Sequence, residues 1–195
     1  RAGDAGVLSR PREPLRQGYL RPGKTFVLYR GSAWRSSLAA TTLQDMGLSP
    51  DCIWPLGATL GEGPLWWDGA LWFTDIMQEK IHRFDPDTGG KASWDAPAPP
   101  GFLAPGRDGH FLAGVKTGLM DFDPATACFA PICEVEPTRP TNRLNDGAVD
   151  PEGRLWFGSM DDGEQARTGM LYRFYRGSLA PMDSGYVITN GPAFS

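Results

Sequence analysis

The chain has 195 residues, of which 41% are hydrophobic and 11% aromatic, which is enough apolar surface for a packed core. Its formal net charge of −4 argues against nucleic acid as a partner, because nucleic-acid-binding proteins carry basic surfaces. No stretch approaches the roughly 18 apolar residues of a membrane span and there is no secretory signal, so we expect a soluble cytoplasmic protein with no membrane contact.

The first 45 residues differ in composition from the rest. They hold eight Lys and Arg against three Asp and Glu, a net charge of +5, whereas residues 46–195 carry −9. Residues 1–45 show neither the alternation of a strand nor the period of a helix, and the first methionine is Met46. We interpret 1–45 as a non-native or disordered leader and 46–195 as the folded part. An Arg-rich transit peptide is the alternative, although the prolines of the segment disfavour an amphipathic helix.

A repeat runs through the folded part. Acidic-Gly turns stand at Asp68-Gly69, Asp108-Gly109 and Glu152-Gly153, a period of about 40 to 44 residues. Each unit has a short strand, this turn, a second strand and a later third strand, which ends at Asp85-Pro86 and Asp123-Pro124 in two units. Short strands between Gly, Asp and Pro turns predict an all-β chain, and this period predicts β-propeller blades. The strands hold four tryptophans that we expect in the core: Trp66, Trp67, Trp72 and Trp156.

The residues that open the first strand of each unit form a set. They are Glu62, Phe102, Asp146 and Asn190, and the first and last both precede Gly-Pro. Because equivalent positions of propeller blades surround one axis, we expect these side chains to converge at one end of the tunnel. The alternatives are a solvated surface turn at Glu62 and a hairpin turn at Asn190. Pro192 weakens the hairpin alternative, since it lacks the N–H of a paired strand residue, so we expect a strand to open there.

A second cluster of polar residues lies in the segment Asn142–Gly147. Asn-Asp-Gly is a good tight-turn sequence, but a turn does not require Arg143 and Asn145. Arginine offers a planar fork of donors and asparagine offers a donor with an acceptor, which suits a polyhydroxylated or carboxylated ligand. We therefore regard Arg143 and Asn145 as candidate ligand-binding residues.

Three motifs follow one another along the chain: GEGPLWW, NRLNDGAVDPEGRLWFGSM and ITNGPAFS. In these motifs and their order, the chain resembles the senescence marker protein, gluconolactonase and regucalcin family over about residues 50–195. The similarity is greatest to bacterial sugar lactonases of the D-xylonolactonase and L-arabinolactonase type. The resemblance implies a six-bladed β-propeller, of which the chain holds about the N-terminal half, with one divalent metal near the tunnel mouth. It further implies that Glu62 and Asn190 bind the metal and that Arg143 and Asn145 bind the substrate.

The function implied by the resemblance is metal-dependent hydrolysis of a sugar aldonolactone (xylono-, arabino- or gluconolactone) to the aldonic acid. The general base would be an aspartate beyond Ser195, so we expect the chain by itself to be inactive. The metal is calcium, ferrous iron, manganese, magnesium or zinc, and oxygen ligands favour the harder ions. The roles of four further acidic residues stay open: Asp146, Asp161, Asp162 and Glu164.

A non-catalytic calcium-binding or interaction propeller is the alternative, because a fold does not specify a function. Such a scaffold needs turn residues at the strand entrances but no particular ligands. The set Glu62, Asn145, Asp146 and Asn190 shares the same region of the repeat. That set therefore favours the enzyme.

Overall fold

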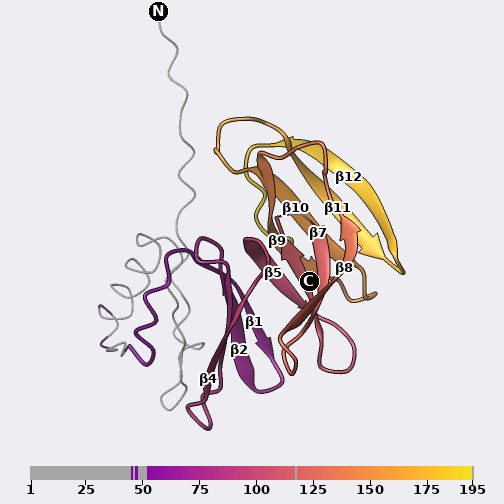
Figure 1. Cartoon of the computed structure of the whole chain (residues 1–195). Coiled ribbons are helices and arrows are strands. Elements are labelled where there is room, and N and C mark those ends of the chain that lie inside the picture. The colour runs from indigo at the N-terminus through magenta and orange to yellow at the C-terminus, as the bar shows by residue number, and fades with distance from the viewer. Residues whose placement is uncertain (1–44, 46, 48–51, 117, 195) are drawn as a thin grey trace, which may run out of the picture.

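The computed structural model describes residues 45, 47, 52–116 and 118–194, so nearly all of the leader 1–45 lies outside the described residues. The described residues form three four-stranded antiparallel sheets (Figure 1). The first contains β1 (Gly61–Trp67), β2 (Ala70–Asp75), β3 (Lys80–Phe84) and β4 (Lys91–Asp95). The second contains β5 (Pro100–Pro105), β6 (Phe111–Val115), β7 (Gly118–Asp123) and β8 (Cys128–Glu134). The third contains β9 (Asn142–Val149), β10 (Leu155–Asp161), β11 (Gly169–Tyr175) and β12 (Ser178–Tyr186).

The predicted repeat is confirmed by the register of the strands. Glu62 of β1 pairs with Thr74 and Phe102 of β5 pairs with Gly114, while Asp146 of β9 pairs with Gly158. The three strand-opening residues thus occupy equivalent places in the three sheets. Between β1 and β2, Asp68 and Gly69 have φ of 49° and 72°, the positive values that a two-residue hairpin turn requires.

Each sheet has a fourth strand that the sequence pattern did not reveal. These strands, β4, β8 and β12, lie at the sheet edges and are largely exposed. Pro131 and Pro181 lie within two of them, which an edge strand tolerates because only one side of it forms ladder hydrogen bonds. Four antiparallel strands joined in chain order make each sheet a propeller blade, so the chain forms part of a β-propeller.

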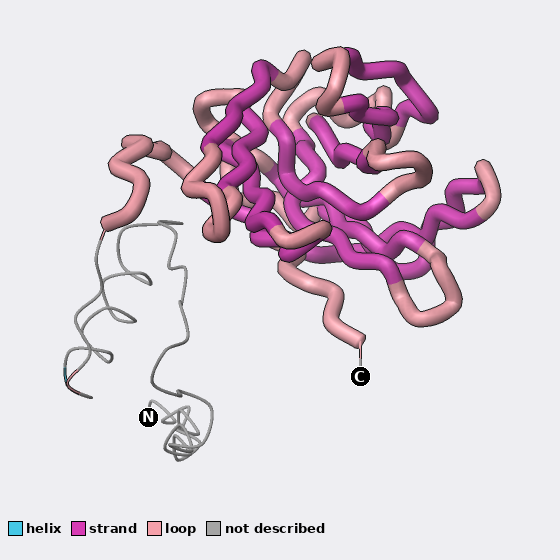
Figure 2. The backbone as a smooth tube through the Cα atoms, turned by 90° about the horizontal axis from the view of Figure 1, so that it is seen from below, coloured by secondary structure: helices cyan, strands magenta, loops and turns pink. Residues whose placement is uncertain are grey.

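The three blades stand side by side in chain order, with β1, β5 and β9 as their inner strands (Figures 1 and 2). One cluster of buried residues joins the first two blades and includes Ile81 and Phe111. A second cluster joins the second and third blades and includes Phe102 and Phe157. The described residues make three blades, so the six-blade ring stays a prediction. No helix among these residues is long and apolar enough to cross a lipid bilayer.

Two details of the sequence prediction are wrong. Trp72 is buried as expected, but Trp66 and Trp67 are 59% and 43% exposed. They are the last two residues of β1 and lie outside the core cluster that Leu65 joins. The expected strand after Asn190 is also absent, because residues 187–194 run as a loop without strand pairing (Figure 2).

His82 of β3 is a titratable group in the core of the first blade. The residue is 1% exposed, and its ring packs against Phe73 and Trp54 at centroid distances of 5.0 and 5.7 Å. Its Nδ1 lies 2.8 Å from Ser93 Oγ, while its Nε2 has no hydrogen-bond partner in the described part of the chain. Burial lowers the pKa of His82 below 6.5, and the nearby Asp75 only partly opposes this.

We therefore expect acid to destabilise the protein through His82. As the pH falls below about 6.5, the unfolded chain binds a proton at this residue that the folded chain excludes, so the free energy of unfolding falls. Urea unfolding at about pH 7.5 and about pH 5.5 should show a smaller acid-induced loss in His82→Gln than in wild type. Equal losses in the two proteins would assign the acid sensitivity to other groups.

Candidate functional site

A cavity of about 270 Å³ lies at the end of the blades where β1 and β9 begin. It contains all four residues that the sequence assigned to metal or substrate, together with two of the acidic residues whose roles were open. The lining residues are Leu60, Glu62, Gly63, Ile76, Arg143, Asn145, Asp146, Met160, Glu164, Ile188 and Asn190. Phe102, the equivalent residue of the second blade, is 1% exposed and packs into the core. The predicted convergence therefore holds for the polar members of the set.

β-Bulges present two of these side chains to the cavity. The pairing of β1 with β2 shifts just after Glu62, and the pairing of β9 with β10 shifts between Leu144 and Asp146. Asn145 is the residue left without a ladder partner. A bulge turns a side chain away from the alternation of a regular strand, which is how Asn145 comes to line the cavity beside Asp146.

Asp75 at the end of β2 holds the segment that leads into Glu62. Its carboxylate accepts hydrogen bonds from the backbone N–H of Thr59 at 2.7 Å and of Leu60 at 3.0 Å. Thr74 Oγ1 also donates to the carbonyl of Glu62 at 3.2 Å. These bonds fix the backbone on both sides of Gly61, so Glu62 enters the cavity from a rigid strand.

Asn145 connects β9 to the loop that carries Asn190. Its Nδ2 donates to the carbonyl of Thr189 at 2.5 Å and lies 3.4 Å from Asn190 Oδ1. Its Oδ1 accepts a hydrogen bond from Arg143 Nη1 at 2.5 Å. Asn145 therefore holds together the residues that the sequence assigned to substrate and to metal.

Arg143 is held from two sides. It is 7% exposed, and its Nε donates to Asp162 Oδ1 at 2.9 Å while Nη1 binds Asn145. Lys116 Nζ lies 3.3 Å from the other oxygen of Asp162. The charge of this buried guanidinium is thus balanced by a carboxylate, and its planar group is fixed in orientation.

Asp146 anchors the Asn190 loop. Its Oδ2 accepts a hydrogen bond from the N–H of Gly191 at 2.9 Å, and its Oδ1 accepts one from its neighbour Gly147 at 2.8 Å. Burial raises the pKa of Asp146, and these two N–H groups partly oppose the shift because they stabilise the carboxylate. The sequence left the role of Asp146 open, and its bond to Gly191 was not visible in the repeat.

The acidic residues after Met160 divide into different roles. Asp161 accepts hydrogen bonds from the N–H groups of Gln165 and Ala166 at 2.9 and 2.8 Å, which lower its pKa and shape the loop. Asp162 pairs with Arg143. Glu164 lines the cavity. Of the three, only Glu164 is among the residues that line the cavity.

The oxygen donors of the cavity fit a hard divalent ion as a partial coordination set. Glu62 supplies a carboxylate and Asn190 an amide oxygen, which calcium, magnesium, manganese and ferrous iron accept. Within the described ranges no group of three His, Cys, Asp or Glu side chains is arranged to hold a metal. The His and Cys ligands that zinc prefers are not among the lining residues.

A larger groove of about 520 Å³ lies at the opposite end of the second and third blades. It is lined by residues of the turns β5–β6, β9–β10 and β11–β12 and contains His110, whose Nδ1 lies 2.8 Å from Asp121. None of the strand-opening residues reaches it. The smaller cavity is therefore the better candidate site, since the in-register oxygen donors lie there.

The chain matches known proteins over the blades. The sequence model of a family described as SMP-30/Gluconolactonase/LRE-like region matches residues 60–195. L-arabinolactonase of Azospirillum brasilense is 38% identical over 120 residues, which cover 59% of this chain and 40% of that protein. 6-Deoxy-6-sulfogluconolactonase of Pseudomonas putida is 29% identical over 147 residues, which cover 74% of this chain and 50% of that protein.

A solved structure agrees with these matches. The crystal structure of a calcium-binding protein, regucalcin, from Agrobacterium tumefaciens superposes with a TM-score of 0.64 at 30% sequence identity, covering 66% of this chain and 44% of that one. The chain spans half or less of the length of these relatives. Because the family match covers residues 60–195, which include all three blades and the cavity, the chain belongs to the SMP-30/gluconolactonase/LRE-like family.

Proposed function

We propose that this chain supplies the metal-binding and sugar-binding part of a lactonase that hydrolyses a sugar aldonolactone to the aldonic acid. One observation carries the proposal: Glu62, Asn145 and Asn190, which are far apart in sequence, line a single cavity in a chain whose relatives include named sugar lactonases. A scaffold that binds neither a metal nor a sugar has no need for a carboxylate and two amides at this point.

The proposed roles follow from the chemistry of the side chains. Glu62 and Asn190 would hold one divalent ion, which would polarise the lactone carbonyl and would stabilise negative charge on its oxygen. Asn145 and the fixed guanidinium of Arg143 would orient the sugar ring. Glu164 would accept hydrogen bonds from sugar hydroxyls. For the general base we propose an aspartate outside the described residues, which withdraws a proton from the attacking water.

The direct test is turnover by the protein at its natural length. Xylono-, arabino- and gluconolactone would be assayed by acid release after chelation, and again after adding back calcium, magnesium, manganese, ferrous iron or zinc singly. We expect hydrolysis that is lost on chelation and restored by an oxygen-preferring ion. Metal-independent turnover would contradict the metal role, and the absence of turnover with every ion would contradict the lactonase.

A calcium-binding propeller without enzymatic activity is the second candidate, favoured by the description of the Agrobacterium tumefaciens relative as a calcium-binding protein. Calcium titration followed by calorimetry separates the two functions. Calcium binding that depends on Glu62, with no turnover of any lactone, would favour the second candidate.

Asn145→Ala provides a sharper test of the division of roles. We expect kcat/KM to fall by about tenfold or more, because the variant loses the amide that faces the cavity and orients Arg143. Metal affinity should fall less, since the variant keeps the carboxylate of Glu62 and the hydrogen bond from Gly191 to Asp146 that also anchors the Asn190 loop. Asp95→Asn on exposed β4 is the control and should match wild type. Loss of the metal together with activity would place Asn145 among the metal ligands.

A further inference from the structure

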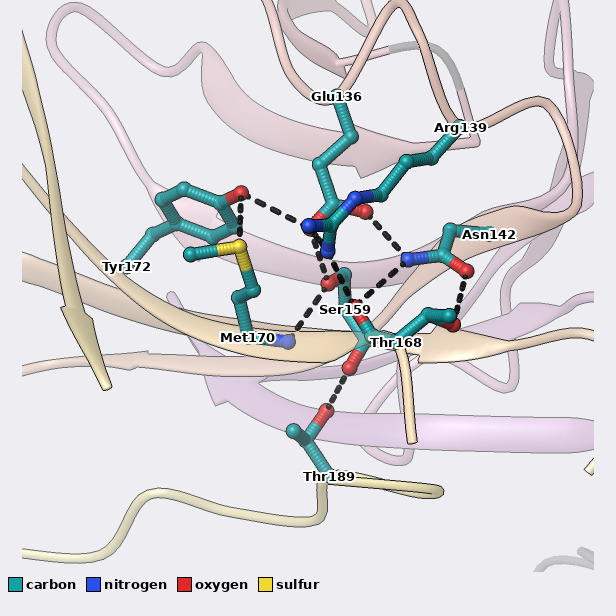
Figure 3. A network of polar contacts seen from close by, with 8 residues as sticks. All are labelled: Glu136, Arg139, Asn142, Ser159, Thr168, Met170, Tyr172 and Thr189. Atoms are coloured by element: carbon teal, nitrogen blue, oxygen red, sulfur yellow. Dashed lines mark hydrogen bonds and ion pairs between the residues drawn. The ribbon is translucent and has the colours of Figure 1, made fainter. Parts of the chain in front are cut away.

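A buried polar network lies behind the cavity and is centred on Glu136, in the segment between β8 and β9 (Figure 3). The Glu136 side chain is 6% exposed. Its Oε1 accepts hydrogen bonds from Ser159 Oγ and from the hydroxyl of Tyr172, both at 2.8 Å. Its Oε2 accepts one from Asn142 Nδ2 at 2.6 Å. One carboxylate thus binds side chains of β9, β10 and β11.

A guanidinium and a hydroxyl lie against the carboxylate of Glu136. Arg139 Nη1 lies 3.8 Å from Oε1 and donates to the carbonyl of Thr168 at 2.6 Å. Burial raises the pKa of the Tyr172 hydroxyl, which therefore stays protonated and donates. A buried carboxylate is costly unless it is paired and hydrogen-bonded. Here three donors and a guanidinium meet that requirement.

Two short connections lead from Glu136 to the cavity. Ser159 is fully buried, and its carbonyl accepts a hydrogen bond from Thr189 Oγ1 at 3.1 Å. The carbonyl of Thr189 in turn accepts the hydrogen bond from Asn145. On the other side, Asn142 is the first residue of β9 and directly precedes Arg143. Glu136 itself does not line the cavity.

We propose that Glu136 is a positioning residue for the cavity. By holding Ser159 and the first residue of β9, it sets the place of the Thr189–Gly191 loop and of Arg143, without touching a bound ligand. The inference predicts an effect on the mobility of the loop and an effect on lactone hydrolysis. Only the effect on hydrolysis rests on the proposed lactonase function.

A charge swap can test the geometry. Glu136→Gln leaves one acceptor oxygen where the carboxylate had two. If that oxygen keeps Ser159 and Tyr172, the new NH2 group faces the Nδ2 donor of Asn142. Adding Asn142→Asp restores one carboxylate to the contact. This carboxylate accepts a hydrogen bond from the amide introduced at position 136 and another from Thr168 Oγ1, which lies 2.7 Å from Asn142 Oδ1 in the wild type. The double variant should therefore recover part of what the single variant loses, since the hydrogen bond that Asn142 Nδ2 donates to the Thr168 carbonyl at 3.2 Å in the wild type is not restored.

The measurement is hydrogen–deuterium exchange at the Gly191 amide, which is hydrogen-bonded to Asp146 in the loop. We expect Glu136→Gln to speed this exchange by about tenfold or more and the double variant to reverse part of that increase. Tyr172→Phe removes one of the three hydrogen-bond donors to Glu136 and should raise the exchange rate of the same amide by a smaller factor. The matched control is Ile81→Val, which weakens the core of the first blade without touching the network.

The outcomes separate the two proposals. Exchange at Gly191 that is unchanged in Glu136→Gln and Tyr172→Phe, or that rises equally in Ile81→Val, would overturn the positioning role. If the exchange pattern is as expected and kcat/KM falls with it in Glu136→Gln, both proposals are supported. If the pattern is as expected but wild type hydrolyses no lactone, positioning stands and the lactonase proposal fails.

Discussion

Glu62→Gln is expected to weaken divalent-metal binding by at least about 100-fold and to remove most lactonase activity. Glu62 lines the cavity and stands at the strand entrance that shares its register with Asp146. Asp146 already accepts two backbone hydrogen bonds. The substitution keeps the size of the side chain but removes a full negative charge, so the attraction of a dication for the cavity falls sharply.

Calcium and manganese titrations on the natural-length protein, followed by calorimetry, would measure this effect beside kcat/KM. Glu152→Gln makes the same chemical change at the turn end of the third blade, where the side chain is 64% exposed, and should behave as wild type. Melting temperatures would confirm that both variants are folded. Undiminished metal affinity in Glu62→Gln would remove this residue from the proposed metal site.

Gly158→Ala is expected to distort the cavity by steric overlap alone. A Cβ at this position of β10 would lie 2.2 Å from Thr189 Oγ1 and 2.4 Å from Thr189 Cβ. The Cβ of Thr189 cannot rotate away, so the loop that carries Asn190 must shift. Overpacking of this kind costs about 1–3 kcal/mol of stability. Because Asn145 binds the carbonyl of Thr189, we expect kcat/KM to fall by about 100-fold.

Two further variants show whether the loss comes from this contact. Gly90→Ala, in the β3–β4 turn, places its Cβ 3.0 Å from Thr88 Oγ1, and this hydroxyl can rotate away, so activity should be retained. Adding Thr189→Gly to Gly158→Ala removes the colliding atoms and should recover part of the activity. A Gly158→Ala variant with wild-type kcat/KM would show that the loop position is not critical.

Much of the fold was predictable because its signals are local. The acidic-Gly pairs at Asp68 and Asp108 adopt the positive φ that their turns require. They also mark the period, from which the register of Glu62 and Asp146 follows. The sequence pattern did not predict the edge strands β4, β8 and β12, because an exposed strand needs no regular apolar alternation. Trp66 and Trp67 were misassigned because a tryptophan in a strand does not reveal whether a neighbouring sheet covers it.

The sequence by itself determined which strand-opening residues face one end of the blades, since the repeat places Glu62 and Asp146 at equivalent positions and the turn residues enforce that register. Only the tertiary structure decided how they are held. The bond of Asp146 to Gly191, the pairing of Arg143 with Asp162 and the bonds of Ser159 and Tyr172 to Glu136 join segments that lie well apart in the chain. Such contacts depend on how the strands and loops approach in space, and a repeat pattern contains no information on which donor meets which acceptor across that distance.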